Sequence, residues 1–275
     1  MTVPTIYLEQ VAALALADQI SEWLKERLDE AHADRFVLGL SGGIDSAVVA
    51  GLCARAAGPE RVLAVMMPSA SNPDDLACAM EVAETFGLKS TTIDLTSVAD
   101  TFYASVPDVA TVFSGVLGEE PGNGIEERSQ LAKANVRPRL RMLTLYYLAN
   151  LARGIVVGTG NKTELMIGYF TKYGDGGVDI FPLTDLYKFE VRAVARAIGV
   201  PERVITRPPS AGLWEGQTDE QEIGLTYDEL DSTLSAMDTG HASLLDSEVH
   251  ARVQHMVSTT AHKRAPVPTF SRKRP

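Results

Sequence analysis

From Val37 to Ala50 the chain reads VLGLSGGIDSAVVA, and this stretch decides the fold. It begins as an apolar run without alternation, passes through two adjacent glycines, and resumes with apolar residues at helical spacing. This pattern predicts a buried parallel strand that turns sharply into a helix. Gly42 and Gly43 let backbone N–H groups approach a ligand, while Ser41 and Ser46 add hydroxyl groups beside the positive end of the helix. The turn therefore suits a phosphate group.

Asp45 lies in the first turn of this predicted helix, where a carboxylate repels phosphate unless a divalent cation lies between them. We therefore interpret the stretch as a site for a nucleotide with Mg²⁺. Composition alone gives about equal weight to a simpler alternative, a tight turn in which Asp45 only complements the helix dipole. The chain contains neither a Gly-Lys-Ser/Thr Walker loop nor a Gly-x-Gly-x-x-Gly motif, which disfavours Walker-type kinases and dehydrogenases.

Length and composition predict a single domain spanning residues 1–275. The net charge of −11 argues against a general nucleic-acid binder, which needs a basic surplus. No apolar run approaches the roughly 20 residues of a membrane helix, and the first residues do not form a secretion signal, so we expect a cytoplasmic protein without a membrane partner. Cys53 and Cys78 lie in apolar helix faces and are expected to be buried thiols rather than a disulfide or a metal pair.

Segments of strand length alternate with helical patterns along the chain. Five such strands are predicted, at residues 35–40, 61–67, 89–94, 154–159 and 180–182. The alternation predicts a doubly wound α/β fold, with a mostly parallel five-stranded sheet and helices on both faces. Ligands of such sheets bind at the carboxyl ends of the strands, which is where the glycine turn falls.

A second acidic residue follows a second strand. Asn161 and Glu164 fit a helix capping box, and spacing alone gives this structural role about even odds. The alternative is that Glu164 supplies the second carboxylate that Mg²⁺ needs beside Asp45.

Several polar or apolar segments are further candidates for function. The glycine-rich loop at 169–179 is too polar for a core, and the irregular segment at 208–220 is interpreted as a mobile lid. A long helix is predicted at 126–150 with a kink at Pro138. This helix and the apolar stripe at 16–28 are candidate dimer surfaces, although packing within the chain is the simpler role of the stripe.

Taken together, the motifs resemble those of the ammonia-dependent NAD synthetases, within the ATP pyrophosphatase superfamily. The resemblance rests on six motifs that occur in order, namely Ser41-Gly42-Gly43-Ile44-Asp45-Ser46, residues 158–164, residues 172–179, Leu186-Tyr187-Lys188, residues 216–220 and His262-Lys263-Arg264. The first motif alone indicates only the superfamily. The resemblance implies an adenine nucleotide alpha hydrolase-like fold. It also implies the amidation of deamido-NAD with ammonia, driven by the conversion of ATP to AMP and pyrophosphate through an adenylated intermediate.

The resemblance also implies residue roles. The positions that match the ATP site are Gly39, Leu40, Ser41, Gly42, Gly43, Ile44, Asp45, Ser46, Thr159, Lys188 and Ser210. The positions that match the deamido-NAD site are Arg139, Lys172, Asp179, His262 and Lys263. Asp45 and Glu164 match the Mg²⁺ ligands, and Asp175 and Lys188 match catalytic positions, Asp175 being the residue suspected of deprotonating ammonium. Family members are dimers, which implies a homodimer.

One departure and several alternatives accompany this interpretation. Many bacterial members have an arginine that touches ATP where this chain has Met66. The chain also lacks room for a glutaminase domain before its first strand, so free ammonia is the expected nitrogen donor.

The alternative functions are another ligase with this loop, such as a GMP-synthetase-like or tRNA-modifying enzyme, or a non-catalytic nucleotide-binding regulator.

Overall fold

A computed structural model describes residues 8–109, 111–118, 120, 122–209, 218–241 and 246–272. Its sheet has the strand order β3-β2-β1-β4, and all three strand pairs are parallel. The strands are β1 (Arg35–Gly39), β2 (Val62–Met66), β3 (Lys89–Thr92) and β4 (Gly154–Val156). β1 lies between β2 and β4, with Phe36 opposite both Val62 and Ile155. The central position of β1 places the glycine turn in the middle of the carboxyl edge of the sheet.

The fifth expected strand is reduced to a single parallel bridge between Val157 and Ile180 in the described part of the chain. Pro182 explains why pairing stops there, because proline has no backbone N–H to donate to a neighbouring strand. The parallel α/β fold is confirmed, with four strands and this bridge in place of five strands.

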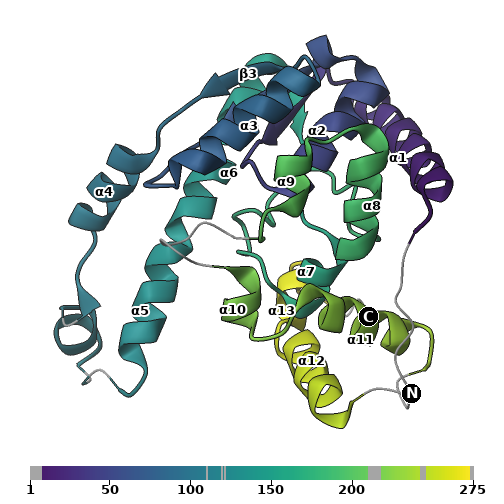
Figure 1. Ribbon diagram of the computed structural model, residues 1–275. Helices are drawn as coiled ribbons and strands as arrows, with labels where there is room; N and C mark the ends of the chain where they lie inside the picture. The colour runs from purple at the N-terminus through teal and green to yellow at the C-terminus, as the bar shows by residue number, and fades with distance from the viewer. Residues whose placement is uncertain are drawn as a thin grey trace.

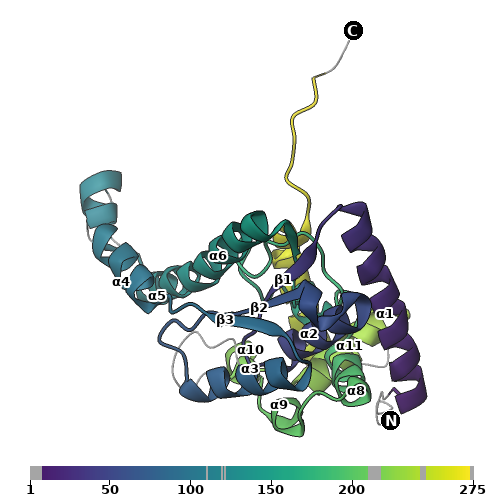
Figure 2. The same cartoon turned by 90° about the horizontal axis from the view of Figure 1, so that it is seen from above.

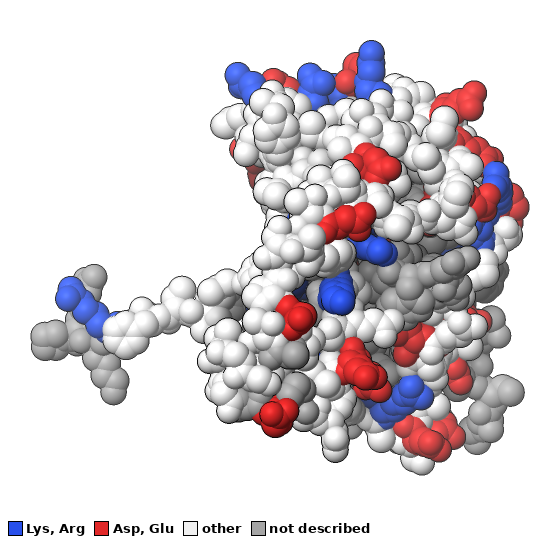
Figure 3. Space-filling view, turned by 90° about the vertical axis from the view of Figure 1, so that its left-hand side faces the viewer, with Lys and Arg blue, Asp and Glu red and all other residues white. Residues whose placement is uncertain are grey.

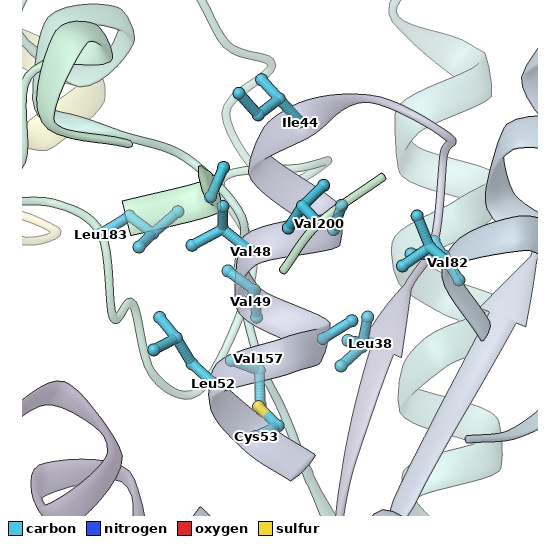
Figure 4. Packing of buried hydrophobic residues seen from close by; sticks show 14 of the residues in the cluster. Leu38, Ile44, Val48, Val49, Leu52, Cys53, Val82, Val157, Leu183 and Val200 are labelled. Carbon is cyan, nitrogen blue, oxygen red and sulfur yellow. The ribbon is translucent and has the colours of Figure 1, made fainter. Parts of the chain in front are cut away.

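Helices cover both faces of the sheet (Figures 1 and 2). The larger core lies between one face and four helices, α1 (Gln10–Glu30), α2 (Ile44–Ala57), α3 (Pro73–Thr85) and α8 (Lys188–Ile198). Figure 4 shows this core around α2, where Val48 and Leu52 lie near Leu183. The other face packs against α6 (Val136–Ala152) through Val37, Leu145 and Ala149. Strands β1, β2 and β4 are therefore largely buried, which explains their apolar sequence, whereas the edge strand β3 is exposed at all four residues.

The apolar stripe of α1 packs inside the chain. Ile20, Leu24 and Leu28 are all buried in the larger core. The proposal that this stripe forms a subunit surface was wrong, and packing is its role. Cys53 and Cys78 are buried and free, as the sequence predicted.

The long predicted helix is interrupted, but three residues before Pro138. It divides into α5 (Ile125–Ala134) and α6, with Asn135 between them. The ring of Pro138 would clash with the carbonyl of Ala134, four residues earlier, so the first helix ends at that residue. α5, together with α4 (Thr96–Ser105) and a π-helical turn (Thr111–Leu117), extends away from the sheet as an arm (Figures 1 and 2).

The C-terminal part forms a second, smaller helical layer. Its helices are α7 (Lys162–Ile167), α10 (Asp219–Ile223), α11 (Tyr227–Asp238), α12 (Ser247–Thr259) and α13 (Ala261–Arg264), whereas α9 (Glu202–Thr206) packs against the larger core. Tyr227, Leu230 and Val253 lie at its apolar centre. None of the described helices is long and apolar enough to cross a membrane.

Candidate active site

The glycine turn is braced by its own serines. The hydroxyl of Ser46 donates to the carbonyl of Gly43 at 2.9 Å and accepts from the backbone N–H of Ser41 at 3.2 Å. Gly42 has a φ of +83°, and a Cβ there would lie 2.2 Å from the carbonyl oxygen of Asp75. Only glycine fits this position. The turn is thus a rigid loop at the N-terminus of α2.

Two carboxylates converge on one buried ammonium group beside this turn. Lys188 Nζ lies 2.5 Å from Asp45 Oδ2 and 2.9 Å from Glu164 Oε1, and only 1% of the lysine is exposed. The three residues come from the starts of α2, α7 and α8, at the carboxyl end of the sheet. All three are predicted site residues, and the structure brings them together.

The charges of these groups depend on one another. Burial raises the pKa of Glu164 to about 7, although the positive charge of Lys188 opposes this shift. Burial alone would lower the pKa of Lys188, but the charges of Asp45 and Glu164 raise it above its usual value. The lysine therefore stays charged and compensates two acidic groups.

Glu164 has the structural role that the sequence predicted, that of a helix cap. Its backbone N–H donates to Asn161 Oδ1 at 3.0 Å, and its Oε2 accepts from the Asn161 N–H at 3.5 Å, which completes a capping box. Its other oxygen, Oε1, faces Lys188. Asn161 also donates from Nδ2 to Asp45 Oδ1 at 2.8 Å, so the cap residue connects the two acids. From the sequence, Asn161 was predicted only as a helix cap, and its contact with Asp45 was not predicted.

The position of Lys188 is fixed by a buried acid that the sequence analysis did not name. The Thr163 hydroxyl donates to Asp231 Oδ1 at 2.5 Å and accepts from the Lys188 N–H at 3.1 Å. Asp231 also accepts from the N–H of Phe189 at 2.9 Å, and burial raises the pKa of its carboxyl group. Asp231 thus serves as a side-chain acceptor for the first turn of α8.

A second network joins Glu164 to α10. The Tyr227 hydroxyl lies 3.0 Å from Glu164 Oε1 and 3.1 Å from Asp219 Oδ2. The Tyr169 hydroxyl in turn contacts Asp219 at 3.1 Å and Glu222 at 2.7 Å. Asp219 was part of a quoted motif, whereas the sequence around Tyr227 gave no signal beyond a helix start.

Asp45, Glu164, Lys188 and Asp219 line a cavity of about 560 Å³ at the carboxyl edge of the sheet. It is bounded by the glycine turn, the end of β2, the N-terminal part of α6 and the loop at 168–178. The predicted residues that line it are Gly39, Leu40, Ser41, Gly42, Gly43, Ile44, Asp45, Ser46, Thr159, Glu164, Asp175, Lys188 and Lys263. On the face shown in Figure 3, basic side chains are visible within a hollow of the surface.

Asp175 and Lys263 also line the cavity. Asp175 accepts from the Thr171 N–H at 2.9 Å. It keeps contact with solvent, yet the surrounding protein desolvates its carboxyl group and raises its pKa. Lys263 donates to the carbonyls of Gly168 and Phe170 at 2.7 and 2.8 Å, and burial lowers its pKa.

Arg139, Lys172, Asp179 and His262 do not line this cavity. The first two and His262 form a group beside it, in which Lys172 Nζ donates to the His262 carbonyl at 2.8 Å and Arg139 donates to the Lys172 carbonyl at 3.3 Å. Asp179 accepts from the Val156 N–H at 2.8 Å and from the Tyr146 hydroxyl at 3.0 Å. Ser210 and most of the expected lid lie outside the described residues.

A guanidinium group reaches the end of β2 from another element. Arg141, on α6, donates from Nε to the Met67 carbonyl at 3.1 Å and lines the cavity. Burial, followed by the charge of Arg137, lowers the pKa of Arg141. Many family members have an arginine on the strand at the position of Met66. In this chain Arg141 places a cation beside that position from α6.

Comparisons with known proteins agree with this geometry. A model of the NAD synthase family matches residues 16–267. The NH(3)-dependent NAD(+) synthetase of Archaeoglobus fulgidus is 44% identical over 251 residues, which cover 90% of this chain and 93% of that protein.

Two solved structures share the fold over nearly their whole length. NMN synthetase from Francisella tularensis is 33% identical, with a TM-score of 0.78 over 94% of this chain and 99% of that one. The NH3-dependent NAD synthetase from Campylobacter jejuni, solved with nitrate, is 28% identical, with a TM-score of 0.75 and the same coverage. Both the family match and the identity to the first relative extend over most of the chain. The chain therefore belongs to the NAD synthase family.

Proposed function

We propose that this chain is an ammonia-dependent ligase that converts deamido-NAD to NAD at the expense of ATP. The observation that carries this proposal is the convergence of Asp45 and Glu164 on Lys188, directly beside the glycine turn. Membership of the NAD synthase family supports the identity of the substrates.

The chemistry begins with a carboxylate that is too poor an electrophile to react with ammonia. A carboxylate oxygen of deamido-NAD attacks the α-phosphorus of ATP, and pyrophosphate leaves. Ammonia then attacks the carbonyl carbon, and AMP departs with the former carboxylate oxygen. The N-terminus of α2 beside the glycine turn would bind the pyrophosphate, and Lys188 would neutralise its charge. Thr159 and Ser210 are the further ATP contacts of this proposal.

Asp45 and Glu164 would hold Mg²⁺ on the phosphates. Their oxygens already converge on one cation, the Lys188 ammonium group, and hard oxygen ligands suit this metal. Among the described residues no group of three or more histidine, cysteine, aspartate or glutamate side chains forms a complete metal site. Mg²⁺ commonly takes one or two carboxylates and completes its coordination with substrate phosphates and water. The ion would reduce the charge that develops on the leaving group.

The second nucleotide is assigned to the group formed by Arg139, Lys172, Asp179, His262 and Lys263. Four of these five residues are basic or can become so, which suits the two phosphates of a dinucleotide. Asp175 lies in the same cavity as the turn, and its raised pKa suits a group that accepts a proton from ammonium.

We further propose a cytoplasmic homodimer of single-domain subunits. Leu143, Tyr147 and Leu151 follow one face of α6 and are 62%, 63% and 67% exposed. An apolar row of this kind on a helix is typical of a subunit interface.

The direct test is an assay of the purified chain with ATP, Mg²⁺, ammonium and deamido-NAD, monitored for NAD, AMP and pyrophosphate. Glutamine in place of ammonium tests the nitrogen donor. The corresponding acid mononucleotide is the comparison substrate, because one structural relative is an NMN synthetase. We expect deamido-NAD to give the higher kcat/KM. Preference for the mononucleotide would overturn the substrate assignment while leaving the ligase chemistry intact.

A further inference from the structure

Tyr227 is a buried tyrosine whose hydroxyl points at the site rather than into the core. The residue is fully buried, and its ring packs among Ile167, Leu230 and Val253. Its hydroxyl donates to Glu164 Oε1 at 3.0 Å, and its ring centre lies 4.7 Å from Lys188 Nζ. Packing alone needs only the ring, because a buried hydroxyl stabilises nothing unless it is hydrogen-bonded. The hydroxyl therefore calls for an explanation in the site.

Glu164 Oε1 receives two donors in this structure. One is the Lys188 ammonium group at 2.9 Å, and the other is the Tyr227 hydroxyl. Asp219 Oδ2 lies 3.1 Å from the same hydroxyl, and Asp219 also accepts from Tyr169. A phenol carries a single proton, so Tyr227 serves one of the two carboxylates at a time. Glu164 also accepts from Lys188, and Asp219 also accepts from Tyr169. Each carboxylate therefore keeps one donor when the Tyr227 hydroxyl donates to the other.

The balance changes when ATP binds. Under the proposed function, the cation that Asp45 and Glu164 would hold competes with the Lys188 ammonium group for Glu164, and Lys188 donates to phosphate oxygens instead. Of these two side-chain donors to Glu164 Oε1, the Tyr227 hydroxyl then remains. A carboxylate that is to hold a cation needs such a fixed donor, because outer hydrogen bonds orient metal ligands.

We propose that Tyr227 is a positioning residue, whose hydroxyl holds the Glu164 carboxylate in place when ATP draws Lys188 away from it. This inference rests on the proposed ATP site but not on the identity of the amidated substrate. Tyr227 does not touch the substrate in this role, since it acts through Glu164.

The chain offers a matched control. Tyr187 is also buried, its hydroxyl donates to a carboxylate, Asp238, at 2.7 Å, and Lys162 Nζ lies 4.6 Å from its ring centre. Neither tyrosine lines the cavity. Tyr227→Phe and Tyr187→Phe therefore each remove one hydroxyl that donates to a carboxylate and keep the ring, but only the first removes a donor to Glu164.

The experiment measures ATP binding to the full chain by calorimetry, without deamido-NAD, once with Mg²⁺ and once with EDTA. Melting temperatures of both variants establish that they fold. We expect Tyr227→Phe to weaken ATP binding in Mg²⁺ by about 10- to 100-fold. We expect a much smaller loss in EDTA and no change for Tyr187→Phe in either buffer.

Equal losses for the two variants would overturn the proposal, because the effect would then be a general cost of removing a buried hydroxyl. Equal losses of Tyr227→Phe with and without Mg²⁺ would also overturn it, since Glu164 would then not be the residue through which Tyr227 acts. The result is separable from the proposed reaction. Should the wild-type chain bind ATP as expected but form no NAD, the amidation assignment fails and the role of Tyr227 stands.

Discussion

The ammonium group of Lys188 lies 2.5 Å from the Asp45 carboxylate, although 143 positions separate the two residues in the sequence. The contact joins the N-terminal turn of α8 to that of α2 across the carboxyl edge of the sheet. Glu164 contacts the same ammonium group from α7. This arrangement of one cation between two acids leads to most of the predictions below.

Asp45→Asn should abolish AMP formation and leave the fold intact. The change keeps the size of the side chain but removes the charge that faces Lys188 and, as proposed, Mg²⁺. We expect turnover to fall by about 100-fold or more. The measurements are AMP release and a circular dichroism spectrum, and near-normal turnover would contradict the metal role.

Lys188→Met should destabilise the protein. Removal of the buried cation leaves two acidic side chains close together, each less than one fifth exposed, without their compensating charge. Breaking a buried pair in this way costs about 3–5 kcal/mol of the free energy of unfolding. Urea unfolding measures this loss. Mg²⁺ should raise the melting temperature of the variant more than that of the wild type, and an equal effect on both would argue against a cation site between the acids.

Lys172→Ala should weaken the binding of deamido-NAD more than that of ATP. Lys172 lies outside the cavity that holds the glycine turn, in the basic group with His262. Loss of one charge-assisted contact with a phosphate corresponds to roughly a 10-fold weaker affinity. Titration of each nucleotide separately tests this, with the exposed Lys25 on α1 replaced by alanine as the control. Similar losses for both nucleotides would remove the assignment.

Asp231→Asn should disturb the position of Lys188 without touching the cavity. Asp231 accepts from both Thr163 and the backbone of Phe189, and an amide cannot accept at both of its terminal atoms. We expect the free energy of unfolding to fall by about 1–3 kcal/mol and kcat to fall with it.

The same variant gives a pH prediction. Burial raises the folded-state pKa of Asp231 above its unfolded value, so the folded protein keeps a proton that the unfolded chain has already lost. The wild type should therefore lose stability relative to Asp231→Asn as the pH rises from the unfolded pKa through the folded one. Urea unfolding across the acid range measures the difference, and an opposite slope would contradict the assigned environment.

Leu143→Asp combined with Tyr147→Asp should convert a dimer into monomers. Both side chains are exposed on α6, and charges there oppose the burial of an apolar interface. Sedimentation velocity at micromolar concentration is the measurement. Met80→Asp, an exposed apolar position on α3, is the control that should remain dimeric. A monomeric wild type would refute the proposed dimer.

Motif spacing predicted much of this molecule. The run at 37–50 predicted β1, the turn and α2 within a residue or two, because a buried strand and an apolar helix face leave distinct periodicities. The chemistry of the acidic residues was also visible, since each follows a strand and ligands of doubly wound sheets bind at those ends. Pro138 predicted a break in the long helix, though not that the break would fall at Asn135.

Only the tertiary structure decided which of these groups meet. Periodicity records which face of a helix is apolar but not what covers it, so the stripe of α1 was compatible with either a core or a subunit surface. The sequence was compatible with Asn161 acting only as a local helix cap. The fold adds a second contact, because it places the amide of Asn161 2.8 Å from Asp45. The sequence gives no sign of the role of Tyr227, because tyrosine is an ordinary residue at a helix start. The fold places Glu164 opposite its hydroxyl. The sequence determined the positions of strands and helices, because backbone geometry imposes a local period on apolar residues. The contacts of Asp45, Glu164 and Lys188 depend on the order of the strands and the packing of the helices, which bring distant strand ends to one edge of the sheet.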